Sequence, residues 1–487
     1  MDLITISLIT VVALLFWVVK RKTDPLNRIP GPFRLPIFGN IQFNFPRMHM
    51  QFTEFAQRYG DVFRIQILSQ PAIVINSYAA LKEAYLQKGK HFIGRPHMLR
   101  FEVVRADKGI AFQGYSEKQK HLRTEGIKAL RMESLDHLSS TINENLADLT
   151  KMIRAQNGQA FNPKVLIKKC LVNVILSMIF GEKVDSDDPI LEKIIEFNKV
   201  AVEVATIGRE DVDVWTWTRH FNPNYALSVK GREVFDKNIM PLYLKYKSTY
   251  IEGHERGVID KYISQVNSGK ITDENVCGLL IDYFVGGVET TATTLYGFLL
   301  ILAHLPKVQE RLQSDVDEII GKDRHPRICD RPMLPYVEAC LLELFRYQCT
   351  LPILVPRETI SDTELCGYEI PKGTWVYTNS WAIHHDENLY PDSMSYKPSR
   401  FLDTEGQILP QEHIARKSLV TFGMGGRSCI GENLAKNRLF LSICTLMQNF
   451  TFEADKSCPL PSCDARDYKL KIVFDIHDYS IVAKPRC

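Results

Sequence analysis

The stretch TFGMGGRSCIGENLA, residues 421–435, places a single cysteine in a glycine-rich loop that runs into a segment with helical periodicity. Four glycines lie within nine residues, and because glycine costs conformational entropy on folding, we infer that the backbone approaches another group closely here. The predicted helix begins near Ile430 and extends to Gln448. The free amides and positive dipole at its N-terminus would stabilise a thiolate at Cys429.

The residues around Cys429 predict contact with a flat, acidic ligand. Gly425 is expected to allow a tight turn and Gly431 to let the backbone lie against that ligand. Arg427, two residues before the cysteine, is placed to form charge-assisted hydrogen bonds with a carboxylate. A dinucleotide-binding loop is excluded, because G-x-G-x-x-G would need glycine at Ser428 and no strand clearly precedes the loop. A buried, inert cysteine beside a tight turn is the alternative interpretation.

A second group of residues predicts a charge network beneath this loop. In ELFR, residues 343–346, Glu343 and Arg346 lie one helical turn apart and can pair directly. An exposed pair of this kind would contribute under ~1 kcal/mol. Downstream, the proline-bent segment YKPSRF, residues 396–401, adds Arg400. We expect this arginine to complete a three-residue network that locks the cysteine loop in place.

One long helix is predicted over residues 272–304, ended by Pro306, with a length of roughly 50 Å. Its interior reads VGGVETT, residues 285–291, and two adjacent glycines in a helix cost about 1 kcal/mol each relative to alanine. We infer that the helix has to be narrow at this point, since the two glycines would otherwise only destabilise it. Close packing against another helix is the alternative explanation for the glycine pair.

Length and composition indicate a large globular body of mainly α class with small β-sheets. The chain has 487 residues, 45% of them hydrophobic, which allows an extensive core, and no linker or repeat divides residues 41–487, interpreted as one catalytic domain. A net charge of +3 gives no sign of nucleic-acid binding. Eleven dispersed cysteines without a C-x-x-C pair fit reduced thiols on the cytosolic side. Short strands are predicted at residues 61–67, 72–75 and 471–475.

The N-terminus reads as a membrane anchor, residues 1–22, followed by a proline-rich neck, residues 23–40. Residues 3–19 carry no charge and would span roughly 26 Å as a helix, near the lower limit for a bilayer core of ~30 Å. Three basic residues follow directly, which places the body in the cytosol and is the reverse of a cleaved signal peptide. A buried first helix is the alternative. The neck contains RIPGPFRLP, whose three prolines rule out a helix.

These motifs, in this order and together with the anchor and neck, resemble those of a microsomal cytochrome P-450, a haem-thiolate monooxygenase. Four further stretches resemble the subgroup that includes steroid 17-alpha-hydroxylase and the aryl-hydrocarbon-oxidising enzymes: FIGRPHM at residues 92–98, KGIAF at 108–112, DRPMLPYVEA at 330–339 and NSWAIHHD at 379–386. The resemblance covers essentially the whole chain. It implies the cytochrome P-450 fold, a large helical body with small β-sheets around a buried haem b.

The resemblance implies a set of haem-binding residues. Cys429 would be the axial thiolate on the iron, which is the metal ligand that favours O–O cleavage. Gly431 would lie against the ring and Phe422 would pack beside it near the sulfur. Arg95 in IGRP, Arg357 in VPRE and Arg427 match positions that contact the haem propionates.

One stretch departs from the family pattern. The family usually has a tryptophan followed four residues later by an arginine, and this chain has Glu117 and His121 at those positions. His121 is a candidate propionate ligand, with Lys120 or Arg123 as substitutes. A plain surface histidine is the competing interpretation.

On the oxygen side, the resemblance assigns a role to the middle of the long helix. The pair Gly286 and Gly287 would make room for dioxygen. Glu289 and Thr290 resemble the acid-alcohol pair that delivers protons during oxygen activation, since a carboxylate and a hydroxyl joined by water suit general acid catalysis. Thr291 is expected to be structural.

The implied partners are an electron donor and a membrane. No flavin or nicotinamide motif occurs in the chain, so electrons from NADPH would arrive through the membrane-bound NADPH-cytochrome reductase, with cytochrome b5 as a second candidate donor. The implied location is the endoplasmic reticulum membrane. Five basic residues are candidates for a reductase-docking surface: Lys118, Lys120, Arg123, Lys436 and Arg438.

The expected reaction inserts one oxygen atom of O2 into a lipophilic substrate, namely a steroid, another lipid or an aromatic xenobiotic. Two rivals remain open. One is a haem-thiolate isomerase or dehydratase that rearranges a peroxide without external electrons, and the other is a membrane-tethered haem protein without turnover. The glutamate–threonine pair favours oxygen activation, because a peroxide rearrangement does not need a proton relay.

Overall fold

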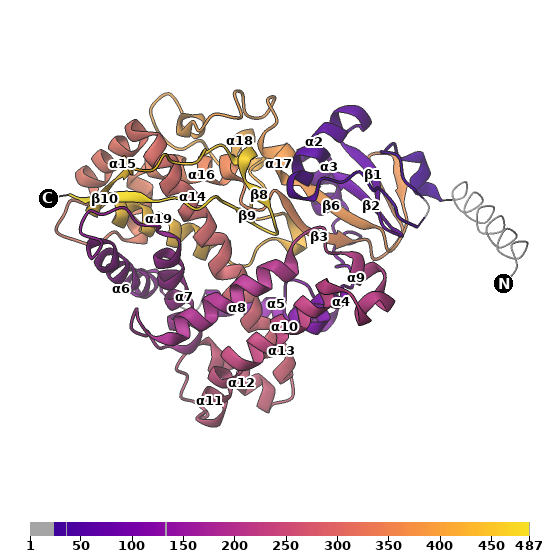
Figure 1. Cartoon of the computed structure of the whole chain (residues 1–487), viewed down its shortest axis with the longest axis horizontal. Coiled ribbons are helices and arrows are strands. Elements are labelled where there is room, and N and C mark those ends of the chain that lie inside the picture. The colour runs from indigo at the N-terminus through magenta and orange to yellow at the C-terminus, as the bar shows by residue number, and fades with distance from the viewer. Residues whose placement is uncertain (1–23, 36, 132–133, 487) are drawn as a thin grey trace, which may run out of the picture. The chain divides into compact units, whose positions relative to one another are not determined.

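The computed structural model describes residues 24–35, 37–131 and 134–486 (Figure 1). The predicted anchor, residues 1–22, lies outside the described residues, as does part of the predicted neck. In the part that is described, one helical stretch, Asp273–His304, is long and apolar enough to cross a membrane, but most of it is buried inside the protein, as expected for a core helix. The chain forms two compact units, described separately below.

The described part of the smaller unit consists of residues 24–35, 37–96, 353–382 and 424–427. A four-stranded sheet with the order β1-β2-β6-β3 organises its described residues. Strands β1 and β2 are antiparallel, β2 and β6 are parallel, and β6 and β3 are antiparallel with an irregularity in β3. The strands are β1 (Val62–Ile67), β2 (Gln70–Ile75), β3 (Ile353–Glu358) and β6 (Trp375–Asn379). The strands predicted at residues 61–67 and 72–75 are therefore confirmed.

Short elements complete this unit around the sheet. Helix α2 packs against strand β1 through buried aromatic residues such as Phe52, which meets Phe63 edge to face. Residues 29–35 are not helical, as the three prolines predict, and they run along β1, where the Arg64 amide donates to the Pro30 carbonyl. The elements are η1 (Pro25–Arg28), η2 (Phe45–Arg47), α2 (Met48–Tyr59), α3 (Tyr78–Lys82), η3 (Glu83–Gln87), β4 (Thr363–Leu365), β5 (Tyr368–Ile370) and η9 (Gly425–Arg427).

The larger unit, described over residues 97–131, 134–352, 383–423 and 428–486, is mainly helical, as predicted. Its first helices are α4 (Leu99–Val103), α5 (Glu117–Leu130), α6 (Leu135–Arg154), α7 (Lys164–Phe180), α8 (Pro189–Ala205), α9 (Asp211–Val214), α10 (Pro223–Asn238), α11 (Met240–Ser248) and α12 (Val258–Asn267). The later helices are α13 (Asp273–Ile281), α14 (Thr290–His304), α15 (Pro306–Ile319), α16 (Pro335–Gln348), α18 (Ile414–Lys417) and α19 (Glu432–Asn449). Helix α17 (Ser380–His384) crosses the chain boundary between the units.

The predicted long helix is confirmed, with one local irregularity. Helices α13 and α14 are joined by a π-helical segment, η6 (Asp282–Glu289), so the helix runs without a break to His304. Thr272 caps its N-terminus in a capping box with Asn275, and Pro306 begins the next helix. The π segment contains both glycines of the predicted thin region. Single-turn π bulges inside α-helices are frequent at functional sites.

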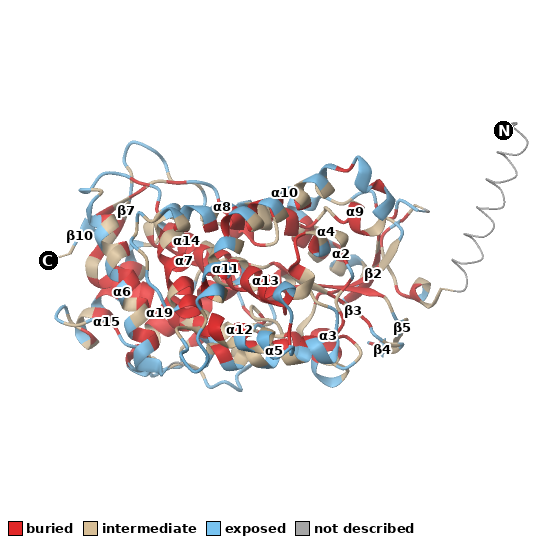
Figure 2. Cartoon of the chain, turned by 90° about the horizontal axis from the view of Figure 1, so that it is seen from below, coloured by how far each residue is buried: buried red, intermediate tan, exposed pale blue. Residues whose placement is uncertain are grey.

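The core of the larger unit surrounds α14. Eleven of its fifteen residues are buried, including the unbroken run from Thr294 to Leu302, so the helix is covered on every side. Helices α7 and α19 are buried in the same way over most of their length. Figure 2 shows these three helices mostly in the colour of buried residues.

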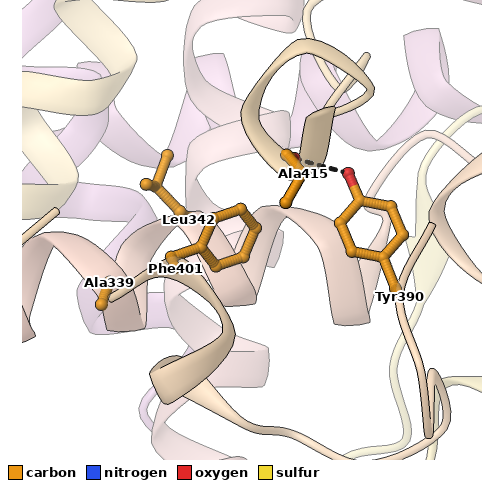
Figure 3. Packing of buried hydrophobic residues seen from close by; sticks show 5 residues of the cluster. All are labelled: Ala339, Leu342, Tyr390, Phe401 and Ala415. Carbon is orange, nitrogen blue, oxygen red and sulfur yellow. Dashed lines mark hydrogen bonds between the residues drawn. The ribbon is translucent and has the colours of Figure 1, made fainter. Parts of the chain in front are cut away.

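A small satellite cluster holds the segment that precedes the cysteine loop. Ala339 and Leu342 of α16 pack with Phe401 at the end of the short helix η8 (Pro398–Phe401). Tyr390 and Ala415 complete the cluster, and the Tyr390 hydroxyl donates to the Ala415 carbonyl at 2.8 Å (Figure 3). These contacts fix the irregular chain around residues 390–415 against α16.

The strand predicted at residues 471–475 is wrong as a single element. The structure has a tight hairpin here, with β8 (Lys469–Leu470) paired antiparallel to β9 (Phe474–Asp475). The amide of Lys471 donates to the Val473 carbonyl, which turns the chain in the middle of the predicted strand. The alternating pattern was too short to distinguish one strand from a turn between two shorter ones. A separate pair, β7 (Phe450–Ala454) and β10 (Ile481–Pro485), lies after α19.

Candidate active site

The cysteine loop closes on itself just before α19. The Cys429 amide donates to the Phe422 carbonyl at 2.8 Å, so the two ends of the loop meet. Gly431 is the N-cap residue of α19 and Cys429 lies two residues before it. The helix predicted at residues 430–448 is confirmed with bounds of 432–449.

The Cys429 residue is exposed, whereas five other cysteines, Cys170, Cys277, Cys340, Cys349 and Cys444, are buried. This contradicts the alternative of an inert buried cysteine. On balance the pKa of the Cys429 thiol is raised, chiefly by desolvation and also by the charge of Glu432. A hydrogen bond from the Gly431 amide and the charges of Arg123 and Arg438 act in the opposite direction and offset part of this cost of forming a thiolate.

The loop glycines have different reasons for being glycine. Gly425 has a φ of 70°, and a Cβ atom there would meet the Tyr85 carbonyl oxygen at 2.2 Å, so the fold itself requires glycine. Gly431 has an ordinary φ of −92°. Among the described residues, a Cβ atom on Gly431 would meet the Cys429 Sγ atom at 3.9 Å and nothing closer. The open side of Gly431 therefore faces the sulfur and leaves room for a flat group.

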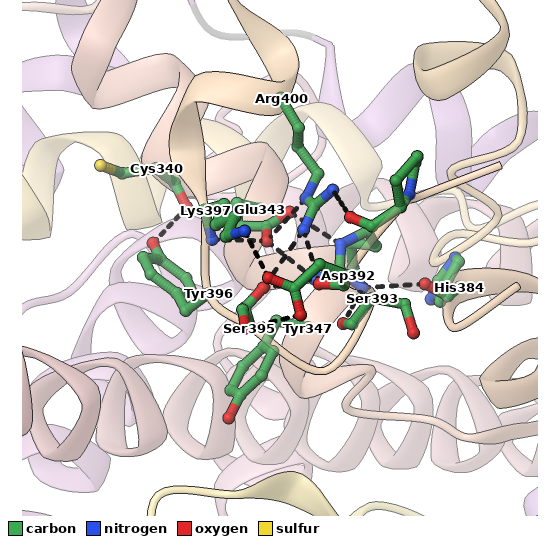
Figure 4. Close-up of polar contacts among 12 residues, drawn as sticks. Cys340, Glu343, Tyr347, His384, Asp392, Ser393, Ser395, Tyr396, Lys397 and Arg400 are labelled. Atoms are coloured by element: carbon green, nitrogen blue, oxygen red, sulfur yellow. Dashed lines mark hydrogen bonds and ion pairs between the residues drawn. The ribbon is translucent and has the colours of Figure 1, made fainter. Parts of the chain in front are cut away.

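The predicted charge network is confirmed (Figure 4). The Nε and Nη2 atoms of Arg346 donate to the two carboxylate oxygens of Glu343, each at 2.7 Å. Both side chains are fully buried. Arg400 adds a contact from its Nε atom to the Glu343 Oε1 atom at 3.0 Å. A bidentate arginine–carboxylate pair with a second arginine satisfies a buried carboxylate that would otherwise be very costly.

Arg346 also fastens the chain on either side of the network. Its Nη1 atom donates to the carbonyls of His384 and Ser393 at 2.9 and 2.7 Å. The backbone amide of Lys397 donates to Glu343 at 2.8 Å. One ion pair on α16 thereby fixes the backbone at residues 384, 393 and 397.

His384 transmits this anchoring to the cysteine loop. Its Nε2 atom accepts a hydrogen bond from the Val420 amide at 2.9 Å, and its Nδ1 atom lies 3.2 Å from the Cys349 sulfur. Burial, followed by the neighbouring charge of Arg346, lowers the pKa of His384 to about 3. The ring is therefore neutral at physiological pH and can accept from Val420, directly before the loop.

The middle of the long helix offers one open glycine and one packed glycine. A Cβ atom on Gly286 would meet no described atom within 4 Å, while one on Gly287 would lie 3.1 Å from Ile175. Gly286 therefore has the free space that was predicted for the pair, whereas Gly287 is packed against another helix, as the alternative explanation predicted. The Thr290 hydroxyl donates to the Gly286 carbonyl at 2.8 Å, beside the open position.

Glu289 and Thr290 are neighbours in sequence but have different contacts. Glu289 is buried, and its Oε2 atom lies 2.7 Å from the ammonium group of Lys168 on α7. Its Oε1 atom has no hydrogen-bond partner among the described residues. Thr291 is buried and accepts from Arg438 at 3.0 Å, in agreement with a structural role. Lys168 has no sequence signal that would have singled it out.

The three arginines predicted to bind propionates lie together in the smaller unit. Arg95 donates to the Val355 and Pro356 carbonyls of β3 at 2.8 and 2.7 Å. Arg357, the next residue of that strand, donates to the Met424 carbonyl at 2.7 Å. Arg427 donates to the Ile93 carbonyl at 2.8 Å, two residues before Arg95. Three distant segments are thus joined by one arginine each.

These bonds to neutral backbone carbonyls orient the guanidinium groups. Arg357 and Arg427 are buried, and the guanidinium of Arg357 lies 3.4 Å from the centre of the Tyr85 ring. A stacked and hydrogen-bonded arginine presents a planar set of donors in a fixed direction. The cluster is suited to carboxylate binding.

The candidates on α5 are placed as follows. The Nε2 atom of His121 lies 3.1 Å from the Oε1 atom of Gln265 on α12. Arg123 reaches the cysteine loop directly, because it donates to the Ser428 carbonyl at 2.7 Å. The sequence offers Arg123 as a substitute propionate ligand, but residue spacing does not reveal its contact with the loop.

The predicted docking surface needs one correction. Lys118 and Lys120 are exposed, and Lys436 is paired with Glu432. Arg438 is only 2% exposed, so it is not part of any surface. Arg438 lies in the part of α19 that is buried from Asn437 to Gln448. The prediction was wrong because a charged residue is normally expected at the surface, and the sequence alone does not show that this part of the helix is buried.

Comparison with known proteins gives one family. The family model described as Cytochrome P450 matches residues 29–478 of this chain. The chain is 32% identical over 469 residues to steroid 17-alpha-hydroxylase/17,20 lyase of Gallus gallus, covering 93% of this chain and 91% of that protein. It is 31% identical to cytochrome P450 1A1 of Rattus norvegicus over 471 residues, covering 91% and 89%. It is 30% identical to cytochrome P450 1B1 of Rattus norvegicus over 483 residues, covering 94% and 88%.

The charge network predicts a large effect of removing Arg346. R346M leaves the fully buried Glu343 carboxylate without its bidentate partner, and we expect a loss of about 3–5 kcal/mol in the free energy of unfolding. R400M should cost less, about 1.5–3 kcal/mol, because a hydrogen bond to a charged group is lost while the main pair remains. Urea unfolding followed by circular dichroism measures both values.

A matched control is K128M. Lys128 pairs with Glu125 at the same i,i+3 spacing, but its side chain is 67% exposed. We expect a change below ~1 kcal/mol for this exposed pair. Equal effects of R346M and K128M would contradict the role given to the network.

His384 predicts a loss of stability in acid. The pKa of His384 in the folded protein, about 3, is below the ordinary histidine value of 6.5. The contribution of the neutral ring to stability is therefore complete above pH 6.5 and is lost as the pH falls toward 3. The unfolded chain binds a proton that the folded protein does not, which gives a slope of about 1.4 kcal/mol per pH unit. H384Q keeps an acceptor for the Val420 amide and should make the slope shallower by that amount, whereas H325Q, at an exposed position, should not. Urea midpoints between pH 7.5 and 5 test this, and identical slopes in H384Q and the unmodified protein would disprove it.

Proposed function

The chain belongs to the cytochrome P450 family, and from that premise we propose that it is a haem-thiolate monooxygenase that oxidises a lipophilic substrate with electrons from NADPH. Members of this family bind haem through a cysteine thiolate. The observation that carries the proposal is the accessible Cys429 thiol before the N-terminus of α19, beside the open face of Gly431. When bound there, haem supplies the oxygen chemistry, and the protein supplies the ligand, the protons and the substrate position.

Two glycines support the fit of a flat, iron-bound group. Neither Gly431 nor Gly286 has a positive φ, and neither meets a described atom closer than 3.9 Å through a Cβ atom. The fold of the described residues therefore gives no reason for glycine at either position. Room for a macrocycle beside the sulfur and for a small molecule beside the long helix is such a reason.

We assign the propionate carboxylates to the arginine cluster of Arg95, Arg357 and Arg427. Each guanidinium is held by a backbone carbonyl, so the direction of its planar donor set is fixed by the fold, and arginine is the side chain best suited to carboxylate binding. Phe422, in edge-to-face contact with Phe345 at 5.1 Å, is assigned to the sulfur side of the ring. His121 remains a candidate for an additional propionate contact.

We assign proton delivery to Thr290 and Glu289. The Thr290 hydroxyl lies beside the open Gly286 position. Glu289 keeps the buried Oε1 atom available to accept a hydrogen bond from water, while Lys168 holds Oε2. A carboxylate held in this way can pass protons through water to the hydroxyl beside the reacting oxygen.

The substrate class follows from the relatives only in outline. One relative is named a steroid 17-alpha-hydroxylase/17,20 lyase, and we propose a lipophilic substrate that is a steroid, another lipid or an aromatic xenobiotic. The ring centroids of Phe101 and Phe112 lie 3.9 Å apart, and we assign this aromatic pair to the substrate pocket. Aromatic faces of this kind suit a planar or polycyclic apolar substrate.

The proposed partners are the membrane-bound NADPH-cytochrome reductase, with cytochrome b5 as a second donor, at the endoplasmic reticulum membrane. The exposed Lys118 and Lys120 on α5 support docking of an acidic protein. Arg123, on the same helix, joins this region to the cysteine loop through Ser428. Electrons would therefore arrive on the side of the molecule that carries the sulfur.

The ligand assignment predicts a spectroscopic signature. The reduced, haem-loaded protein should bind carbon monoxide with the far-shifted absorption band that thiolate ligation produces, and C429S should lose that band because serine does not supply a thiolate. C366S, at another exposed cysteine, is the matched control and should keep it. Retention of the band in C429S would refute the assignment. Consumption of NADPH and O2 with purified reductase separates a monooxygenase from an isomerase.

The proton-delivery assignment predicts uncoupled turnover. T290V and E289Q should still consume NADPH with reductase, but product per NADPH should fall by roughly 10²-fold, because a proton-transfer group is missing. T293V, a neighbour on the same helix, is the control for a lost threonine hydroxyl and should stay coupled. An unchanged ratio of product to NADPH in both T290V and E289Q would count against these roles.

A further inference from the structure

Arg438 occupies an uncommon position for a cation. It lies on α19, nine residues after Cys429, and is 2% exposed. Its Nη2 atom donates to the Gly287 carbonyl at 2.6 Å and to the Thr291 hydroxyl at 3.0 Å. The side chain thus connects the helix that starts at the sulfur with the long helix.

The contacts of Arg438 leave its charge without a carboxylate. Its Nε and Nη1 atoms have no hydrogen-bond partner among the described residues, and its two acceptors are neutral. Burial lowers its pKa to about 10, and the two groups that act in the opposite direction are Cys170 and Cys429. A cation buried in this way is costly unless a negative charge lies nearby.

Of these two thiols, Cys429 is the one that can carry the charge. Cys170 is buried, and burial raises its pKa to about 12, so it stays a neutral thiol. A thiol that coordinates a metal ion is deprotonated outright. Coordination of iron would therefore give Arg438 its counter-ion at Cys429.

The Gly287 contact of Arg438 belongs to a wider pattern in the π segment. Three of its carbonyls accept hydrogen bonds from side chains: Phe284 from Asn198 at 2.9 Å, Gly286 from Thr290 at 2.8 Å, and Gly287 from Arg438 at 2.6 Å. A π-helical turn displaces carbonyls from the regular α-helical ladder, and side-chain donors stabilise such a displacement. Arg438 fixes the segment immediately beside the open Gly286.

We propose that Arg438 is a positioning residue that serves as the buried counter-cation of the Cys429 thiolate and holds the π segment of the long helix at Gly287 and Thr291. This inference rests on the proposed function, because the thiolate exists when iron is bound. A fixed positive charge near the sulfur favours the reduced state of the bound haem, since reduction adds a negative charge. The same side chain also connects α19, which follows Cys429, to the long helix that carries Glu289 and Thr290.

The test is the midpoint potential of the haem in the full-length, haem-loaded protein, measured by spectroelectrochemical titration without reductase. R438K keeps the charge, R438Q keeps a hydrogen-bond donor, and R438M keeps neither. We expect R438K to stay near the unmodified protein. R438Q and R438M should shift the reduction equilibrium about tenfold toward the oxidised form, which corresponds to about 59 mV for one electron.

Two controls separate charge from structure. K484M removes an exposed lysine paired with Glu453 and should leave the potential unchanged. T291V removes one acceptor of Arg438 but keeps the cation, so its potential should also stay near that of the unmodified protein. A purely structural role would lower thermal stability in R438Q and R438M without moving the potential.

The outcomes are distinct. Equal potentials in R438Q, R438K and the unmodified protein would overturn the counter-cation role, and if R438M does not fold, the comparison of R438Q with R438K still decides. A potential shift in T291V as large as in R438Q would also overturn it, because the charge is intact there. The carbon monoxide spectrum of the unmodified protein, recorded first, tests the proposed function independently of any change at Arg438.

Discussion

The buried pair of Glu343 and Arg346 is the interaction on which the cysteine loop depends. Its cost is high, because two charges leave water, and it is offset by a bidentate geometry and by carbonyl and amide contacts on both sides. Those contacts hold the end of α17 and the irregular chain at residues 393–397, next to the cluster that packs against α16. His384 then carries the constraint to Val420, one residue before the loop. A loop rich in glycine keeps one conformation because its base is fixed by buried charge.

A second constraint concerns the long helix, which has to be both a core element and part of the site. Helix α14 is covered on every side and cannot move without disturbing the core. The π segment before it has an open position at Gly286. Three of its backbone carbonyls accept hydrogen bonds from side chains. Rigidity is thus concentrated in one half of the helix, and local irregularity in the other half provides space. The close contact of Gly287 with Ile175 shows that only one glycine of the pair provides it.

Sequence patterns predicted the parts of this structure that are encoded locally. The cysteine loop, the start of α19, the long helix with its end before Pro306 and the strands β1 and β2 all depend on spacing, turn residues and periodicity within short windows. The network of Glu343, Arg346 and Arg400 was predictable because its members lie in two recognisable motifs. The hairpin at β8 and β9 was missed because alternation over five residues does not reveal a turn.

Contacts between distant segments could not be predicted, and they decide what the buried charges do. Nothing in the sequence around Lys168 indicates that it faces Glu289, and nothing around Arg438 indicates burial. Both depend on which helix faces which, a property of the packed core. Arginine suits such positions because its planar donors can bind several carbonyls at once while the charge remains available to a more distant anion. Arg95 donates to two backbone carbonyls, and Arg357, Arg427 and Arg438 each donate to a backbone carbonyl. The backbone acceptors therefore hold each of these four guanidinium groups in a fixed direction.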